Sequence, residues 1–153
     1  MRKVKQVLEN IVLVQFTLLI GIVFFQVCLR YFLNMSISWT EEFSRIMFIW
    51  MVFIGAVLVL DQGSHFVFDV FIGLLPKKLQ IIASILSDLL VLMLLLFIAF
   101  WGFKLSLFNM AQRTTIMGIS YFLVYMIIPV SLSIMSIIKI MQLLFTIRNY
   151  DKY

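Results

Sequence analysis

This sequence has few of the residues on which catalytic and cofactor sites depend. Cys28 is the one cysteine and His65 the one histidine among 153 residues. A single cysteine excludes an internal disulfide, a CxxC redox pair and a cysteine-rich metal site. A single histidine excludes a haem held between two histidines of this chain. His65 also lies outside the expected spans, where it is a poor general base for a serine buried within them. We therefore expect no enzyme, no catalytic residue, no metal ligand and no cofactor in this chain.

Charged residues are also scarce, at 12% of the chain against 64% hydrophobic residues. A soluble domain of this length would be unable to cover so much apolar surface, so the lipid bilayer is the expected solvent. The net charge of +5 comes from basic residues at the ends of apolar runs. That placement predicts membrane topology signals and no nucleic-acid partner.

Long apolar runs predict an all-α integral membrane protein that forms a single domain over residues 1–153. A helix needs about 20 residues to span the bilayer. The expected transmembrane helices cover about 7–32, 39–60, 79–108 and 119–147, with a short interfacial amphipathic helix at about 64–75. The first run is long for a signal peptide and lacks a small-residue cleavage pattern, so we expect it to be retained.

Lysine and arginine residues are unevenly divided between the two ends of the expected helices. One side carries Arg2, Lys3, Lys5, Lys77, Lys78, Lys139, Arg148 and Lys152, and the other carries Arg30, Arg45, Lys104 and Arg113. The richer side includes both termini. The positive-inside rule therefore predicts that both termini are cytoplasmic.

Charged residues close to the hydrocarbon are costly, so each one is a candidate functional residue. The first cluster opens the second helix, where Glu41 and Arg45 have the spacing of an intrahelical salt bridge and Glu42 points in another direction. Either the cluster stabilises the helix start or it docks another subunit at the outer surface. Trp39 fits an interfacial aromatic belt, and Gly55 would permit a close helix approach.

Polar residues at three further places are also candidates. Gln15, Gln26 and Arg30 share a side of the first helix and predict a seam that faces protein. His65 lies between carboxylates, including Asp69, where anchoring at the cytoplasmic interface is favoured over a metal site or a proton relay. Asp88 is either an ion or proton ligand deep in the membrane, or polar packing near its edge.

The order of these features resembles the small membrane subunit of the tripartite ATP-independent periplasmic (TRAP) transporters, the DctQ-like family. The segments that carry the resemblance are RYF at 30–32, SWTEExxR at 38–45, FIGA at 53–56, HxxxD at 65–69 and LP at 75–76. The matching part covers roughly residues 28–78. The four-helix plan with both ends inside fits the whole chain.

The resemblance implies a bacterial inner-membrane subunit of a sodium-driven symporter that takes up organic acids such as dicarboxylates or sialic acid. It implies two protein partners, a large transmembrane subunit that holds the transport and Na⁺ sites and a periplasmic substrate-binding protein. The small subunit would be a scaffold. Glu41, Glu42 and Arg45 would lie at the periplasmic end, and His65 and Asp69 in the cytoplasmic interfacial helix.

Two other functions stay open at this point. A self-sufficient four-helix transporter acting as a homodimer would make Asp88 essential. A membrane scaffold of some other complex would have stable partners but no role in organic acid uptake.

Overall fold

The computed structural model describes residues 2–35, 37–61 and 77–150, and in these ranges the chain forms four long helices. They are α1 (Arg2–Phe32), α2 (Ser38–Asp61), α4 (Lys77–Phe108) and α5 (Tyr121–Tyr150). Each is long and apolar enough to cross a membrane. The prediction of an all-α membrane protein with four spans is therefore confirmed.

The helices differ from the predicted spans mainly at their polar ends. α1 begins at Arg2 and α5 continues to Tyr150, beyond the apolar runs that set the predicted bounds. Arg148 in the last turn of α5 favours its extension, because a positive charge is stabilising at the C-terminal end of a helix. The predicted interfacial helix at 64–75, with His65 and Asp69, lies outside the described residues. It stays a prediction.

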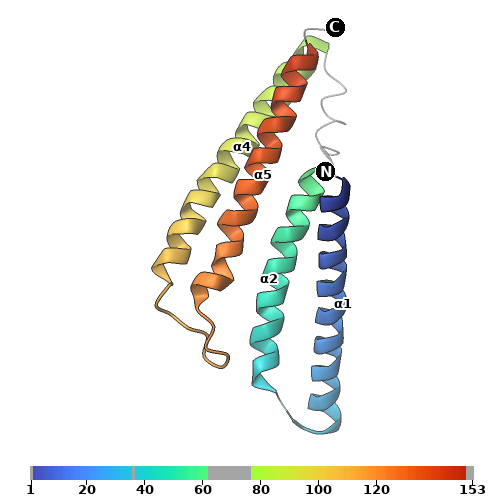
Figure 1. The fold of residues 1–153 in the computed structure, drawn as a ribbon, viewed down its shortest axis with the longest axis vertical. Coiled ribbons are helices and arrows are strands. Elements are labelled where there is room, and N and C mark those ends of the chain that lie inside the picture. Colours follow the sequence, from blue (N-terminus) through green and yellow to red (C-terminus); the bar gives the residue numbers. More distant parts are fainter. Residues whose placement is uncertain (1, 36, 62–76, 151–153) are drawn as a thin grey trace.

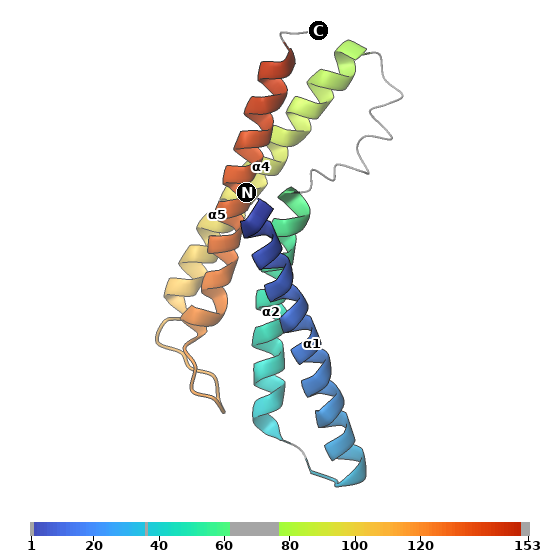
Figure 2. The same cartoon turned by 45° about the vertical axis from the view of Figure 1, so that its right-hand side comes forward.

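The four helices stand in a single row, in the order α1, α2, α5, α4 (Figures 1 and 2). Contacts join α1 to α2, α2 to α5 and α5 to α4, and within the described ranges no other pair of helices touches. The last helix in the sequence therefore lies in the middle of the row. A row leaves far more helix surface uncovered than a closed bundle does, which suits a protein surrounded by lipid and partners.

α1 meets α2 along a seam with alternating spacings of three and four residues, as in coiled coils. The partly shielded positions of α1 on this seam are Leu8, Val12, Gln15, Leu19, Ile22, Gln26 and Leu29. Gln15 and Gln26 thus face protein, as the sequence predicts. Arg30 does not join them, because it is exposed in the last turn of the helix.

The turn after α1 closes this first hairpin. The Leu33 and Met35 amides both donate to the Leu29 carbonyl, and Asn34 adopts the left-handed conformation with a φ of 51°. Asparagine tolerates this conformation better than most residues. The chain therefore reverses within a few residues and starts α2 beside α1.

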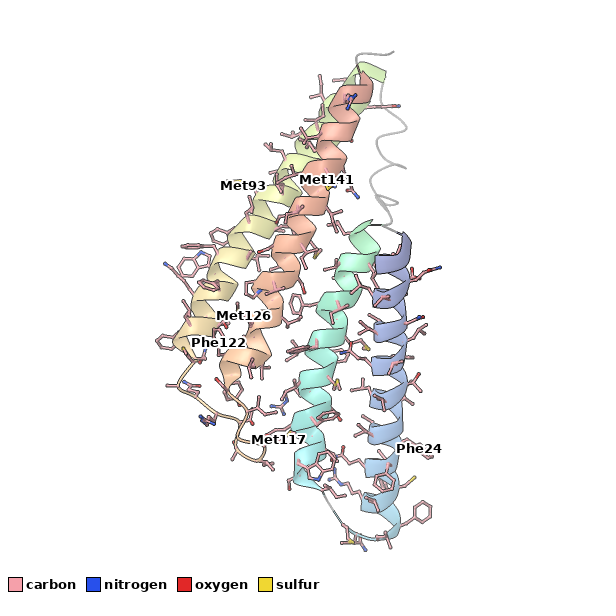
Figure 3. The ribbon with its side chains drawn as sticks, in the orientation of Figure 1. Phe24, Met93, Met117, Phe122, Met126 and Met141 are labelled. Carbon is pink, nitrogen blue, oxygen red and sulfur yellow. The ribbon has the colours of Figure 1, made fainter. Side chains whose placement is uncertain are left out.

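α4 and α5 pack closely because small residues lie between them. A Cβ atom on Gly102 would stand 3.3 Å from Ile128 Cγ2 and 3.6 Å from Pro129 Cδ. One turn later, the fully buried Ser106 hydroxyl donates to the Phe122 carbonyl at 3.1 Å. Figure 3 shows Phe122 and Met126 of α5 beside α4. Small side chains and an interhelical hydrogen bond are the usual means by which membrane helices associate.

Candidate functional site

The loop between α4 and α5 is a compact hairpin. The Thr114 amide donates to the Ile119 carbonyl at 2.8 Å, and the Gly118 amide donates to the Thr114 carbonyl at 3.1 Å. Gly118 has a φ of +66°, which glycine adopts without a steric penalty. An isolated antiparallel bridge pairs Arg113 with Ser120. The hairpin presents the backbone of its tip, residues 115–117, to its surroundings.

The Glu42 carboxylate binds the tip of this hairpin. Its Oε1 accepts a hydrogen bond from the Ile116 amide at 3.1 Å, and its Oε2 accepts one from the Met117 amide at 2.9 Å. Figure 3 shows Met117 beside the first turns of α2. Hydrogen bonds to an ionised carboxylate are stronger than those between neutral groups. We call this contact the Glu42 clasp, since it ties α2 to the α4–α5 hairpin.

The predicted salt bridge between Glu41 and Arg45 is wrong. Among the described residues no such ion pair forms within 4.0 Å, and Glu41 Oε1 instead accepts a long hydrogen bond from Gln26 Nε2 at 3.4 Å. Arg45 lines a small cavity of about 120 Å³ with Glu42, Thr114, Tyr121 and Tyr125. Helical spacing alone made the pair possible, but Glu41 instead contacts Gln26 of the neighbouring helix α1.

Asp88 and Lys139 form an ion pair between α4 and α5. Lys139 Nζ lies 2.7 Å from Asp88 Oδ1, and the lysine is fully buried while Asp88 is 6% exposed. Asp88 follows the start of its span at Ile82 by six residues, which corresponds to about 9 Å of helix. Lys139 precedes the end of its span at Leu144 by five residues. The pair is therefore at matching depth in the two helices.

This pair corrects one prediction and adds to another. Lys139 does not mark a membrane edge, because its ammonium group is inside the protein, held by a carboxylate. Asp88 has a partner that neither of its two predicted roles included. A signal was present in the sequence, since Asp88 and Lys139 lie at nearly equal distances from the loop that joins their helices, 20 residues before Phe108 and 18 after Tyr121.

Gln142 makes a further contact between helices that sequence reasoning missed. Its Nε2 donates to the Leu60 carbonyl at 3.0 Å, next to the end of α2. The last carbonyls of a helix have no partner within the helix, so a side chain from α5 satisfies one of them. Nothing in the sequence near Gln142 marks it as a partner for α2.

The remaining predicted residues are not gathered into one site. Trp39 is half exposed and packs edge-on against Phe43, with ring centroids 6.3 Å apart. Gly55 lies in the last third of α2, and a Cβ atom on it would meet no atom within 4 Å. Within the described ranges, no group of three or more His, Cys, Asp or Glu residues is placed to hold a metal ion.

Comparisons with known proteins agree on one family. The family model described as "Tripartite ATP-independent periplasmic transporters, DctQ component" matches residues 19–149. A TRAP transporter small permease protein of Haemophilus influenzae is 33% identical over 124 residues, which cover 81% of this chain and 75% of that protein.

Two relatives carry names that include a transported compound. The sialic acid TRAP transporter small permease protein SiaQ of Vibrio cholerae is 26% identical over 121 residues, 78% of this chain and 70% of its own length. The isethionate TRAP transporter permease protein DctMQ of Oleidesulfovibrio alaskensis is 26% identical over 101 residues, 65% of this chain but only 16% of its own length.

Proposed function

Because this chain belongs to the DctQ component family of the TRAP transporters, we propose that it is the fixed scaffold subunit of a sodium-driven importer of organic acids. Membership of the family makes it a small permease subunit and a multi-pass protein of the inner membrane. The scaffold role, the driving ion and the substrate class are the proposed parts.

The observation that carries the scaffold role is the way α2, α5 and α4 are locked together. The Glu42 clasp and the Gln142 contact tie α2 to the α4–α5 unit at opposite ends of α2, and the Asp88–Lys139 pair ties α4 to α5. Breaking the buried ion pair is costly, and the charge-assisted hydrogen bonds of the clasp are stronger than those between neutral groups. Sliding of these helices past one another is therefore disfavoured, as a non-moving part requires.

The same ion pair disfavours a self-sufficient transporter. Such a protein needs a carboxylate that binds and releases the coupling ion. Asp88 is the one carboxylate inside the described part of the α4 and α5 spans, and it is paired with a buried lysine. We therefore assign the transport and Na⁺ sites to a larger membrane subunit and propose no cofactor in this chain.

The names of the relatives support the substrate class and the partners. Sialic acid and isethionate are both organic acids. In the isethionate protein the match takes up a small part of a much longer permease chain. A large membrane subunit and a periplasmic binding protein are thus the partners we propose.

We also propose that both termini face the cytoplasm. Removing the buried Lys139 from the eight basic residues on the terminal side leaves seven, against four on the other side. The positive-inside rule still gives the same orientation. The Glu42 clasp then lies at the periplasmic end, where a binding protein would approach.

Uptake into proteoliposomes tests the proposal. Labelled organic acids are offered under an imposed sodium gradient to vesicles that hold this chain, the large subunit and the binding protein, or sets from which one is omitted. We expect uptake only with the full set. Uptake by this chain alone would overturn the scaffold role, and uptake by the full set without a sodium gradient would overturn the proposed driving ion.

A further inference from the structure

Lys104 lies on a side of α4 that no other described helix covers. Within the described ranges α4 contacts α5 alone, and Gly102 and Ser106 both face that contact. Lys104 is two residues from each of them, and two residues of an α-helix correspond to a rotation of about 200°. The lysine therefore projects from the opposite side of α4, and its side chain is exposed.

The ammonium group of Lys104 has no counter-ion in the described part of the chain. Its Nζ lies 4.7 Å from the centroid of the Phe100 ring and 5.1 Å from that of the Trp101 ring, and no described carboxylate is within 4.0 Å. The two rings lie one turn deeper in the span, which ends at Phe108. Contact with aromatic rings offsets part of the cost of a charge at this place, and an anion beside Nζ would offset more of it.

An open apolar hollow surrounds this charge. It has a volume of about 770 Å³, and it is lined by Trp101, Lys104, Leu105, Leu107 and Phe108. These residues belong to the last two turns of α4. Trp101 is about half exposed, as is typical of tryptophans at the level of lipid headgroups. The Lys104 hollow thus combines one positive charge with apolar walls at the end of a span.

A groove between α4 and α5 adjoins this hollow and has a volume of about 590 Å³. Its lining includes Ala99, Phe100 and Phe103 of α4 and Met126, Pro129 and Ser133 of α5. The groove is hollow because Ala99 and Ser133 are small, whereas the side chains around them are large. Phe100 lines the groove and also lies beneath Lys104 Nζ, so the charge and the groove are neighbours.

The groove begins at the level of Lys104 and continues into the hydrocarbon. Met126, which Figure 3 labels beside α4, is at one end of the lining, and its Sδ lies 3.9 Å from Ser106 Oγ, half a turn from Lys104. Ile137 is at the other end, eleven residues further along α5, which corresponds to about 16 Å. One leaflet of the hydrocarbon core is about 15 Å thick. The groove therefore has the length of one leaflet.

We propose that the Lys104 hollow and the α4–α5 groove form a binding site for an anionic phospholipid. The phosphate lies beside Lys104 Nζ, and one acyl chain lies in the groove. The phosphate supplies the missing negative charge, and the acyl chain fills apolar space that offers water no hydrogen-bond partners. The site also has the order of a phospholipid, with the charge near the end of the span and the apolar groove leading inward from it.

Charge and depth favour lipid over a helix of another protein. A partner helix would have to carry a carboxylate into the span, which is costly, whereas a phospholipid has its phosphate at headgroup level. An anionic headgroup is favoured over a zwitterionic one, because the ammonium group of phosphatidylethanolamine repels Lys104. This inference goes beyond the scaffold role and does not depend on it.

Native mass spectrometry of the full chain in detergent tests the charge. Phosphatidylglycerol and phosphatidylethanolamine with identical acyl chains are titrated separately, and we expect phosphatidylglycerol to bind more tightly. Lys104→Gln should weaken its binding about fivefold, the effect of one basic residue beside anionic lipid, and Lys104→Arg should retain it. Arg30→Gln is the matched control and should change nothing, because Arg30 is exposed at the same end of the molecule but lines neither the hollow nor the groove (Figure 1).

The groove is tested by filling it. Ala99→Leu should lower the affinity for both lipids roughly tenfold, as expected if about two CH₂ groups of the acyl chain lose their place, and should keep the preference for phosphatidylglycerol. Leu90→Phe is the control, because it adds bulk at an exposed position of α4 outside the groove. Equal binding of the two lipids, or wild-type binding by Lys104→Gln or Ala99→Leu, would overturn the site.

A photoreactive residue in place of Leu105, inside the hollow, identifies the occupant in the assembled transporter. We expect an adduct with phospholipid. An adduct with the large subunit, or with a second copy of this chain, would overturn the lipid site and leave the scaffold role untouched.

Discussion

Glu42 joins two segments that lie 74 residues apart in the sequence, through hydrogen bonds to both of its carboxylate oxygens. Glu42→Gln leaves one acceptor oxygen and turns an NH₂ group toward an amide that also donates. We expect faster hydrogen exchange at the Ile116 and Met117 amides, measured by mass spectrometry in detergent.

Glu41→Gln is the control for the clasp. Glu41 makes one long contact with Gln26 and none with the hairpin, so exchange at Ile116 and Met117 should stay at the wild-type rate. Equal exchange in the Glu42→Gln and wild-type proteins would show that the clasp does not hold the loop.

The buried ion pair predicts strongly non-additive mutations. Asp88→Leu or Lys139→Met alone leaves an uncompensated buried charge and should lower the free energy of unfolding by about 3–5 kcal/mol. The double variant Asp88→Leu, Lys139→Met replaces both charges with apolar groups and should be close to wild type. The free energy of unfolding of the wild type, the two single variants and the double variant is measured in mixed micelles.

Lys104→Met is the control for removing a lysine from the α4–α5 unit. Lys104 is exposed and lies over the Phe100 and Trp101 rings, at 4.7 and 5.1 Å from their centroids, so its loss should cost less than about 1 kcal/mol. Additive single effects at Asp88 and Lys139 would contradict a shared ion pair.

At the scale of the elements, the α4–α5 contact depends on small residues more than on apolar bulk. Gly102→Leu would place its side chain against Ile128 and Pro129 and force the helices apart, at a cost of about 1–3 kcal/mol. Thermal unfolding in detergent measures the loss. Gly21→Leu, which meets no neighbour, should keep the wild-type midpoint, and a similar midpoint for Gly102→Leu would mean that the close approach is not required.

The spans were predictable from the sequence because hydropathy and length are properties of each segment by itself. The seam of α1 was also predictable, since Gln15 and Gln26 interrupt an apolar helix on one side. Which helices touch was not predictable, because bulky apolar residues such as Phe24 and Met93 look alike whether they face lipid or protein. Both of these are exposed here.

The polar contacts between helices were the other part that sequence reasoning missed. Spacing within one helix favoured a Glu41–Arg45 pair. It contains no information on Gln26, which donates to Glu41, or on the hairpin amides, which donate to Glu42. Asp88 was recognised as unusual without its partner. A charged residue within a span can thus be recognised from the sequence, but its partner depends on which helix packs beside it.

At the scale of the whole molecule, orientation in the membrane can be tested with single cysteines in a Cys28→Ser background. Thr115→Cys lies in the exposed α4–α5 hairpin and Gln6→Cys in the first turns of α1. We expect an impermeant maleimide to label position 115 from the periplasm and position 6 only after the inner membrane is opened. The opposite pattern would reverse the proposed orientation.

The single row of helices has two edges that differ in how firmly they are held. α1 contacts α2 alone and shares one long hydrogen bond with it, from Gln26 to Glu41, whereas α4 contacts α5 alone but shares the buried Asp88–Lys139 ion pair with it. The α2–α5–α4 part is therefore the expected rigid unit, and α1 is the helix whose position depends most on lipid or on a partner.

The most direct test of a fixed scaffold is to lock this unit and measure transport. Leu60→Cys and Gln142→Cys, at the contact between α2 and α5, are joined by a short bifunctional thiol reagent in a Cys28→Ser background, within the fully reconstituted transporter. A scaffold that does not move predicts that uptake continues at the uncross-linked rate. Loss of uptake that returns when the link is cleaved would show that these helices move during transport, and would contradict the scaffold role.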